Sequence, residues 1–165
     1  MTSPRRRVAL GLAMAVAGLV LVAGPAQAGA PLDQLRLQVD RVLKVLDDPE
    51  LKKEGKAKDR RVVVRKIANE IFDFGETAKR SLGRHWAART PAEREEFVQL
   101  FSDLLERSYI SKVELYGGEK IQYVSDSIEE GDQAKVQTML LTKQGGEIPI
   151  EYRMHKKGER WLVYD

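Results

Sequence analysis

The spacing of the apolar residues changes near residue 118 of the chain. From residue 31 to about residue 116, apolar residues recur every three or four positions, which is the period of an α-helix. From residue 121 to residue 165 they alternate with polar residues, which is the period of a β-strand. Helical segments followed by strand segments predict an α+β fold rather than a parallel α/β fold.

Three of the predicted helices lie in the first part of the chain. Apolar stripes predict helices at about residues 32–46 and 59–72, and a short helix follows at residues 76–82. Gly83 is expected to end the short helix, because glycine readily adopts the conformation that follows a helix. Residues 50–60 are densely charged, and we interpret them as a short helix or loop with solvated side chains.

The clearest start of a helix is Thr90-Pro91-Ala92-Glu93, which forms a capping box with proline at the first helical position. The residues behind it predict a helix of about 24 residues with one apolar face. That face consists of Phe97, Leu100, Phe101, Leu104, Leu105, Tyr109, Val113 and Tyr116. Gly117-Gly118 is expected to end this helix.

Four strands are expected in the last part of the chain, at residues 120–128, 133–143, 147–156 and 160–165. Each turn between them contains the glycine that a tight hairpin needs. Connections this short join antiparallel neighbours, so the sequence predicts a four-stranded antiparallel meander. The apolar face of the third strand consists of Ile148, Ile150, Tyr152 and Met154. We expect the helices to cover that face.

Residues 1–28 have the layout of a secretory signal peptide. Three consecutive arginines precede an apolar run at residues 8–23, and Ala26-Gln27-Ala28 forms a cleavage site. The run is shorter than the roughly 20 residues that span a bilayer, although an uncleaved anchor is an alternative. We expect cleavage after Ala28 and export of residues 29–165 to the periplasm.

Charge and composition exclude several classes of protein. The chain has 28 basic and 25 acidic residues, and the only charged residues before Ala28 are the three leader arginines. The expected mature chain therefore carries 25 charges of each sign. A neutral domain argues against nucleic-acid binding, which depends on a basic excess. The absence of cysteine excludes disulfides, thiolate metal sites and cysteine nucleophiles.

The sequence offers little for catalysis. The two histidines, His85 and His155, lie in no metal-binding motif, and the chain has no G-x-S-x-G nucleophile elbow. Aromatic residues and methionines are more informative, because they recur on the faces expected to meet between helices and sheet. They either fill an ordinary core or surround a partly hollow one that holds an apolar ligand.

Several motifs, taken together, resemble one protein family. They are Ile71-Phe72-Asp73-Phe74, Leu82-Gly83-x-x-Trp86, Thr90-Pro91, Phe97-x-x-x-Phe101-x-x-Leu104-Leu105-x-x-x-Tyr109 with Tyr116, and Trp161-Leu162-Val163-Tyr164-Asp165. From about Leu32 to Asp165, the chain is similar to the MlaC, or toluene-tolerance, family of periplasmic phospholipid-binding proteins. Family members usually continue beyond the last strand with a final helix, so residues 29–165 are expected to form a C-terminally short domain of this type.

The resemblance implies an α+β fold in which N-terminal helices pack on a twisted four-stranded antiparallel sheet, with an apolar pocket between them. It implies a carrier with no enzymatic activity, cofactor, metal or nucleic-acid partner. The carrier would move phospholipid between an outer-membrane lipoprotein–porin complex and an inner-membrane ABC transporter complex. This transport would maintain the lipid asymmetry of the outer membrane.

The resemblance implies that the site is a pocket, and the candidate lipid-binding residues are chosen for it by the periodicity of the apolar positions. They are Phe72, Phe74, Phe97, Phe101, Leu104, Leu105, Met139, Leu141, Tyr152, Met154 and Val163. Some of these positions are also expected to belong to the ordinary core.

Three alternatives stay open at this point. The ligand could be another apolar molecule, such as a hopanoid or terpenoid lipid. The fold could carry an enzyme of the ketosteroid-isomerase type, for which Asp73 would be the nearest candidate base and Tyr152 the nearest proton donor. A solid core without a pocket would instead indicate an adaptor that only docks other proteins.

Overall fold

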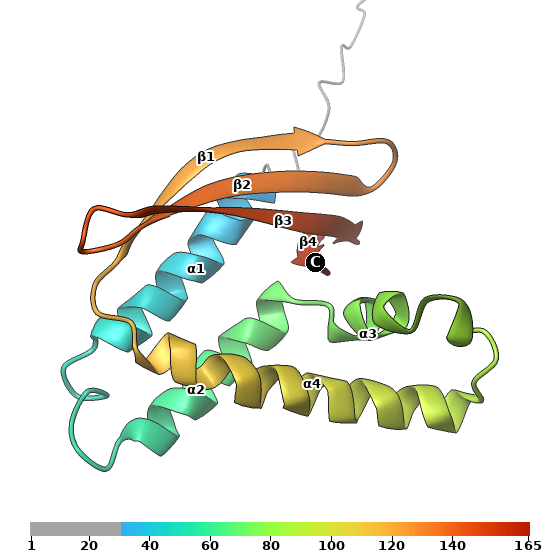
Figure 1. The fold of residues 1–165 in the computed structure, drawn as a ribbon, viewed down its shortest axis with the longest axis horizontal. Helices are drawn as coiled ribbons and strands as arrows, with labels where there is room; N and C mark the ends of the chain where they lie inside the picture. Colours follow the sequence, from blue (N-terminus) through green and yellow to red (C-terminus); the bar gives the residue numbers. More distant parts are fainter. Residues whose placement is uncertain (1–30) are drawn as a thin grey trace, which may run out of the picture.

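The computed structural model describes residues 31–165, in which helices are followed by strands (Figure 1). The expected signal peptide and its cleavage site lie outside the described residues. The helices are α1 (Pro31–Asp47), α2 (Ala57–Ile71), α3 (Phe74–Leu82), the short 3-10 helix η1 (Gly83–His85) and α4 (Pro91–Glu114). The strands are β1 (Lys120–Ile128), β2 (Gln133–Leu141), β3 (Glu147–Lys157) and β4 (Arg160–Val163). The α+β prediction is confirmed.

Local hydrogen bonds explain where the helices begin. At the start of α4, the Glu93 N–H donates to Thr90 Oγ1 at 3.3 Å, and the Thr90 N–H donates to the Glu93 carboxylate at 2.7 Å. This reciprocal pair confirms the capping box. Helix α3 begins two residues earlier than predicted, because Asp73 caps it by accepting the Glu76 N–H at 3.0 Å.

The four strands form one antiparallel meander in the order β1-β2-β3-β4, as predicted. Strand β2 ends at Leu141 rather than at Lys143, because Thr142 uses its backbone and hydroxyl to close the hairpin turn onto Gly145 and Gly146. On the far side of β4, the Asp73 N–H donates to the Val163 carbonyl at 2.8 Å. Strand β4 therefore has a partner on each side.

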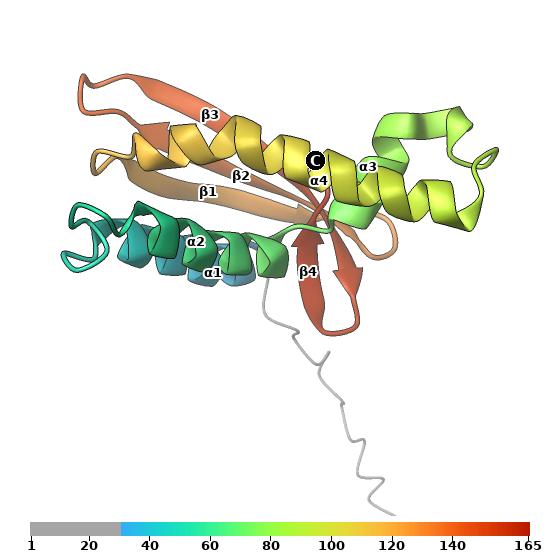
Figure 2. The same ribbon diagram turned by 90° about the horizontal axis from the view of Figure 1, so that it is seen from below.

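The core lies where α1 and α2 cover one face of the sheet (Figures 1 and 2). Its buried members are Leu35, Ile67, Ile71, Ala134, Val136, Met154, Trp161 and Val163. Burying each large side chain stabilises the fold by about 1.5–3 kcal/mol. Gln34 adds a polar link, because it accepts the Trp161 N–H at 2.9 Å and donates to the Glu159 carbonyl at 3.1 Å. These bonds fix the β3–β4 hairpin to α1.

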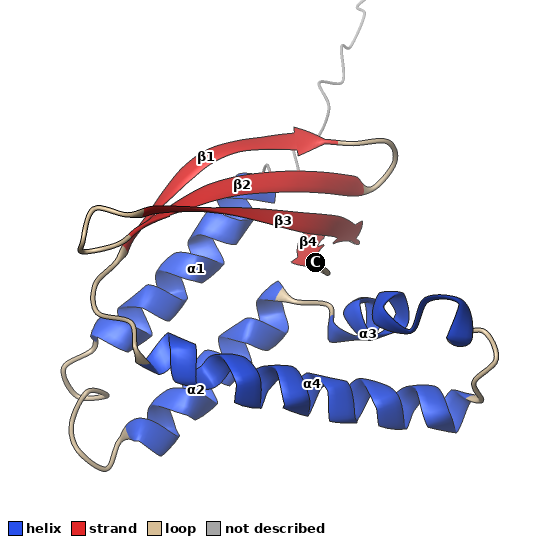
Figure 3. Ribbon diagram, viewed as in Figure 1, coloured by secondary structure: helices blue, strands red, loops and turns tan. Residues whose placement is uncertain are grey.

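Helix α4 is arranged differently from α1 and α2. The helices all lie on the same side of the sheet, and α4 runs beneath β2 and β3 (Figures 2 and 3). Helix α4 packs closely against α3, whereas α1 and α2 are the helices that pack against the sheet. Among the α4 residues whose side chains are described, none is fully buried. The apolar side chains of α4 are therefore not fully buried in the core.

Among residues 31–165, no helix combines the length and the apolar character that crossing a bilayer requires.

Candidate functional site

The first part of the candidate site is the apolar stripe of α4, by which we mean Phe97, Leu100, Phe101, Leu104 and Leu105. The rings of Phe97 and Phe101 stack with their centroids 5.5 Å apart. Leu104 keeps 59% of its surface exposed, and Leu100 is exposed to a similar degree. Exposed apolar surface costs about 25 cal/mol per Å² relative to burial, so contiguous patches usually mark binding sites. The α4 stripe is such a patch.

The second part is the inner face of the sheet, the face toward the helices. The register pairs Val136 with Tyr152 and Leu140 with Ile148 on this face. Along β3, exposure rises from 1% at Met154, in the core, to 48% at Ile148. The inner face is therefore sealed by the core at one end and open at the other.

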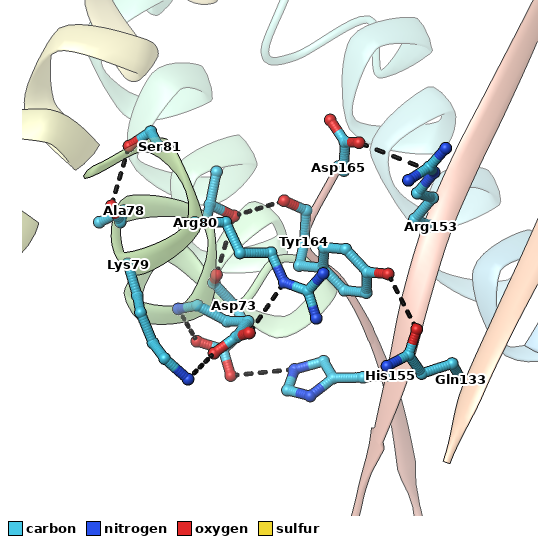
Figure 4. A network of polar contacts seen from close by, with 12 residues as sticks. Asp73, Ala78, Lys79, Arg80, Ser81, Gln133, Arg153, His155, Tyr164 and Asp165 are labelled. Atoms are coloured by element: carbon cyan, nitrogen blue, oxygen red, sulfur yellow. Dashed lines mark hydrogen bonds and ion pairs between the residues drawn. The ribbon is translucent and has the colours of Figure 1, made fainter. Parts of the chain in front are cut away.

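An aromatic pair joins the helices to the inner face. Phe72 and Phe74 lie at the junction between α2 and α3, with ring centroids 5.7 Å apart. Both are partly buried, and Phe72 packs against the core, as does Tyr152. The side chain of Asp73, between them in sequence, points toward a polar region instead (Figure 4).

A cavity of about 640 Å³ lies in this polar region, between α3, the first half of α4 and the end of β3. Its walls include Trp86, Val98 and Gln99 and six charged side chains, three acidic and three basic. The charged side chains are Asp73, Glu76, Lys79, Arg94, Glu95 and Lys157. The Arg94 guanidinium lies 5.4 Å from the Trp86 ring centre and donates to the Trp86 carbonyl at 3.1 Å. The cavity thus differs in character from the α4 stripe.

Asp73 is the centre of a polar network in the wall of this cavity (Figure 4). Its Oδ2 lies 3.2 Å from His155 Nε2 and 3.2 Å from Lys157 Nζ. Burial raises the pKa of Asp73, but the hydrogen bond from the Glu76 N–H and the Lys157 ammonium outweigh burial and bring it below its ordinary value. The Asp73 carboxylate is held by the Glu76 N–H, His155 and Lys157, and its lowered pKa makes it a weaker proton acceptor than the isomerase alternative would favour.

The C-terminal residues complete the same network. The Arg80 guanidinium lies 3.7 Å from the centre of the Tyr164 ring, and the His155 ring meets that ring edge-on at 5.8 Å. Thr77 Oγ1 donates to the Tyr164 carbonyl at 3.0 Å. Tyr164 is buried by these contacts, which fix α3 to the segment after β4.

The eleven residues selected from the sequence fall into five groups. Phe97, Phe101, Leu104 and Leu105 lie on α4, and Phe72 and Phe74 lie at the α2–α3 junction. Tyr152 lies on the inner face, whereas Met154 and Val163 pair with each other in the core. Met139 pairs with Pro149, one position away from the Thr138–Ile150 pair of the inner face. Since side chains alternate along a strand, Met139 and Leu141 lie on the opposite face of the sheet.

Three apolar residues of β2 and β3 at the open end of the inner face were not among the selected residues. They are Leu140, Ile148 and Ile150, all partly or largely exposed. The alternation of β3 grouped Ile148 and Ile150 with Tyr152, so this signal could have found them. The charged cavity had no such signal, because its residues come from α3, α4 and β3. Within residues 31–165, acidic and histidine side chains form no group of three that could hold a metal ion.

Comparison with known proteins identifies related sequences and folds. The family model described as MlaC protein matches residues 37–165. The intermembrane phospholipid transport system binding protein MlaC of Haemophilus influenzae is 26% identical over 110 residues, covering 64% of this chain and 51% of that protein. The chain thus spans about half the length of this curated relative.

Solved structures support the fold. A phospholipid-binding protein from Ralstonia solanacearum, determined in complex with a phospholipid, superposes with a TM-score of 0.71 at 23% identity. The match covers 83% of this chain and 76% of the Ralstonia protein. An NTF2-like transpeptidase from Campylobacter jejuni matches with a TM-score of only 0.36, which carries no argument about function.

Proposed function

Because the chain belongs to the MlaC family, we propose that it is a phospholipid-binding transport protein of the periplasm. We further propose that residues 1–28 are a signal peptide cleaved after Ala28, which leaves residues 29–165 as the exported domain. A related protein is described as part of an intermembrane phospholipid transport system, and a structural neighbour holds a phospholipid. Both descriptions agree with this proposal.

The observation that carries the proposal is the pair of unfilled apolar surfaces on the same side of the sheet. The α4 stripe and the open end of the inner face each remain partly exposed among the described residues. Each buried methylene contributes about 0.8 kcal/mol, so two acyl chains with about 30 methylenes need about 24 kcal/mol of compensating contact. A carrier must supply apolar surface on this scale, and these two surfaces are suited to it.

We assign the acyl chains to the space between these two surfaces. The proposed contacts are Phe72, Phe74, Phe97, Phe101, Leu104, Leu105, Leu140, Ile148, Ile150 and Tyr152. Met154 and Val163 would support this site from the core without reaching the ligand. Met139 and Leu141 are left out because they lie on the opposite face of the sheet.

The proposed partners are those that the family implies. The protein would receive or deliver lipid at an outer-membrane lipoprotein–porin complex and at an inner-membrane ABC transporter complex, and would thereby maintain outer-membrane lipid asymmetry. An energy-consuming step would belong to the ATPase of the transporter, since a carrier only exchanges its ligand. The carrier must also release lipid, so its apolar contacts should match those of a membrane without exceeding them.

Mass spectrometry of organic extracts tests the proposal. The exported protein is purified from a periplasmic fraction without detergent, and its bound lipids are extracted and identified. We expect a two-chain phospholipid at close to one molecule per chain. A hopanoid or terpenoid in its place would favour the alternative ligand class, and a folded protein without any lipid would contradict lipid carriage.

A further inference from the structure

The surface of α2 that faces away from the core is basic. This α2 basic stripe consists of Lys58, Arg61, Val62, Arg65 and Lys66, all of which are exposed. Helical spacing places these residues on the opposite side of α2 from the buried Val64, Ile67 and Ile71. Val62 keeps 64% of its surface exposed among the basic side chains. The stripe therefore combines basic side chains with one exposed aliphatic side chain on the solvent side of α2.

The positive charge of the stripe is local. Residues 58–66 contain five basic residues and one acidic residue, whereas residues 29–165 contain 25 of each sign. The one acidic residue, Asp59, already pairs with Lys56 at 2.7 Å. The stripe itself carries four of these basic residues, of which Arg65 also pairs with Glu106 of α4. It presents a positive surface on a domain that is neutral as a whole, which calls for an anionic partner.

The stripe adjoins the proposed lipid site. Arg65 forms an ion pair with Glu106 of α4, the helix that carries the apolar stripe. More than half of the Arg65 side chain stays exposed in this pair. A surface that docks against α2 would consequently lie beside α4.

We propose that the α2 basic stripe docks the protein on an anionic phospholipid bilayer. Lysine is depleted in protein–protein interfaces, and of the residues that dominate such interfaces the stripe has arginine but neither tryptophan nor tyrosine. Basic side chains interspersed with a small exposed aliphatic residue suit lipid headgroups instead. Such docking goes beyond lipid carriage and does not depend on which lipid the site holds.

Vesicle co-sedimentation tests the docking. The exported protein is mixed with vesicles of phosphatidylcholine alone or of phosphatidylcholine with phosphatidylglycerol, at low and high salt. We expect binding only to the anionic vesicles, with loss at high salt because screening weakens exposed charges. The variant Lys58→Gln/Lys66→Gln should bind about 30-fold more weakly, since each basic residue near an anionic bilayer strengthens binding about fivefold.

The matched control is Arg107→Gln/Lys120→Gln, which removes two exposed charges from α4 and β1. This control should bind the anionic vesicles as the wild type does. Equal loss in both variants would overturn the proposal, because net charge rather than the stripe would then set binding. The proposal would also be overturned if the wild-type protein binds polyglutamate beads but not anionic vesicles. That result would indicate a partner protein with an acidic surface.

Discussion

The Asp73 carboxylate lies 3.2 Å from the His155 imidazole, a contact between residues 82 positions apart in the chain. Asp73 also caps α3, and its N–H donates to Val163 in β4. The short segment at residues 72–74 therefore carries the aromatic pair, begins helix α3 and binds strand β4. These contacts hold the start of α3 beside the end of β4, while α4 packs on α3.

Replacing Asp73 should destabilise the protein by an amount that depends on the replacement. Asp73→Ala removes the cap and the contacts to His155 and Lys157, and should cost about 2 kcal/mol of unfolding free energy. Asp73→Asn keeps a capping oxygen and should cost less. Urea unfolding measures both values. Glu95→Gln, on the same cavity, is the control, and an equal loss in that variant would contradict the role given to Asp73.

The stability of the fold should fall in acid partly through Asp73. Its folded pKa lies below the ordinary value of 3.8, so at acidic pH the unfolded chain binds this proton more readily. The stabilisation is therefore complete above about pH 5 and is lost as the pH falls through the folded pKa. Urea unfolding across this range should show a smaller acid-induced loss in Asp73→Asn than in the wild type. Parallel curves would refute the assignment.

The contact between Arg80 and Tyr164 should be measurable as a coupling energy. The guanidinium lies 3.7 Å from the ring centre, and the ring is buried, so a coupling of about 1 kcal/mol is expected. A double-mutant cycle with Arg80→Gln and Tyr164→Leu isolates this energy from the other losses. Because Arg80 also pairs with Glu76, the single variant alone would not identify the contact. Additive losses in the cycle would rule out the proposed interaction.

The sequence predicted the elements because their signals are local. The capping box of Thr90 and Glu93, the helical stripes and the glycine-containing turns each involve residues close in the chain. The site was predicted less completely, because β2 is apolar on both faces around Met139. Period-two alternation separates the two faces but does not identify which one the helices cover. The Asp73 network depends on folded proximity, so no local pattern predicts it.

Two methionines test which face of the sheet is covered. Met154 is 1% exposed in the core, whereas Met139 lies on the opposite face and is only partly buried. Met154→Ala should cost about 2–5 kcal/mol of unfolding free energy, and Met139→Ala less than about 1 kcal/mol. Bound lipid should be unchanged in Met139→Ala. A loss of lipid in that variant, with stability retained, would return Met139 to the site.

A matched pair of exposed apolar residues tests the lipid surface itself. Leu104 on α4 and Val124 in the β1 bulge are similarly exposed, at 59% and 53%, so replacing either with aspartate should leave the fold stable. Leu104→Asp puts a charge where the proposal places acyl chains, and burying an unpaired charge is strongly unfavourable. Val124→Asp adds the same charge at a residue that is not among the proposed contacts.

Lipid content per folded chain, measured by mass spectrometry after detergent-free purification, distinguishes the two variants. We expect Leu104→Asp to retain at most about one tenth of the wild-type amount of bound phospholipid. A penalty of about 1.4 kcal/mol in the free energy of lipid binding already lowers the affinity tenfold. Val124→Asp should retain the wild-type amount. If both variants keep their lipid, the acyl chains do not lie against α4, and the open end of the inner face alone would have to hold them. If both lose it, net charge or exchange with the membrane, rather than the α4 stripe, controls lipid retention.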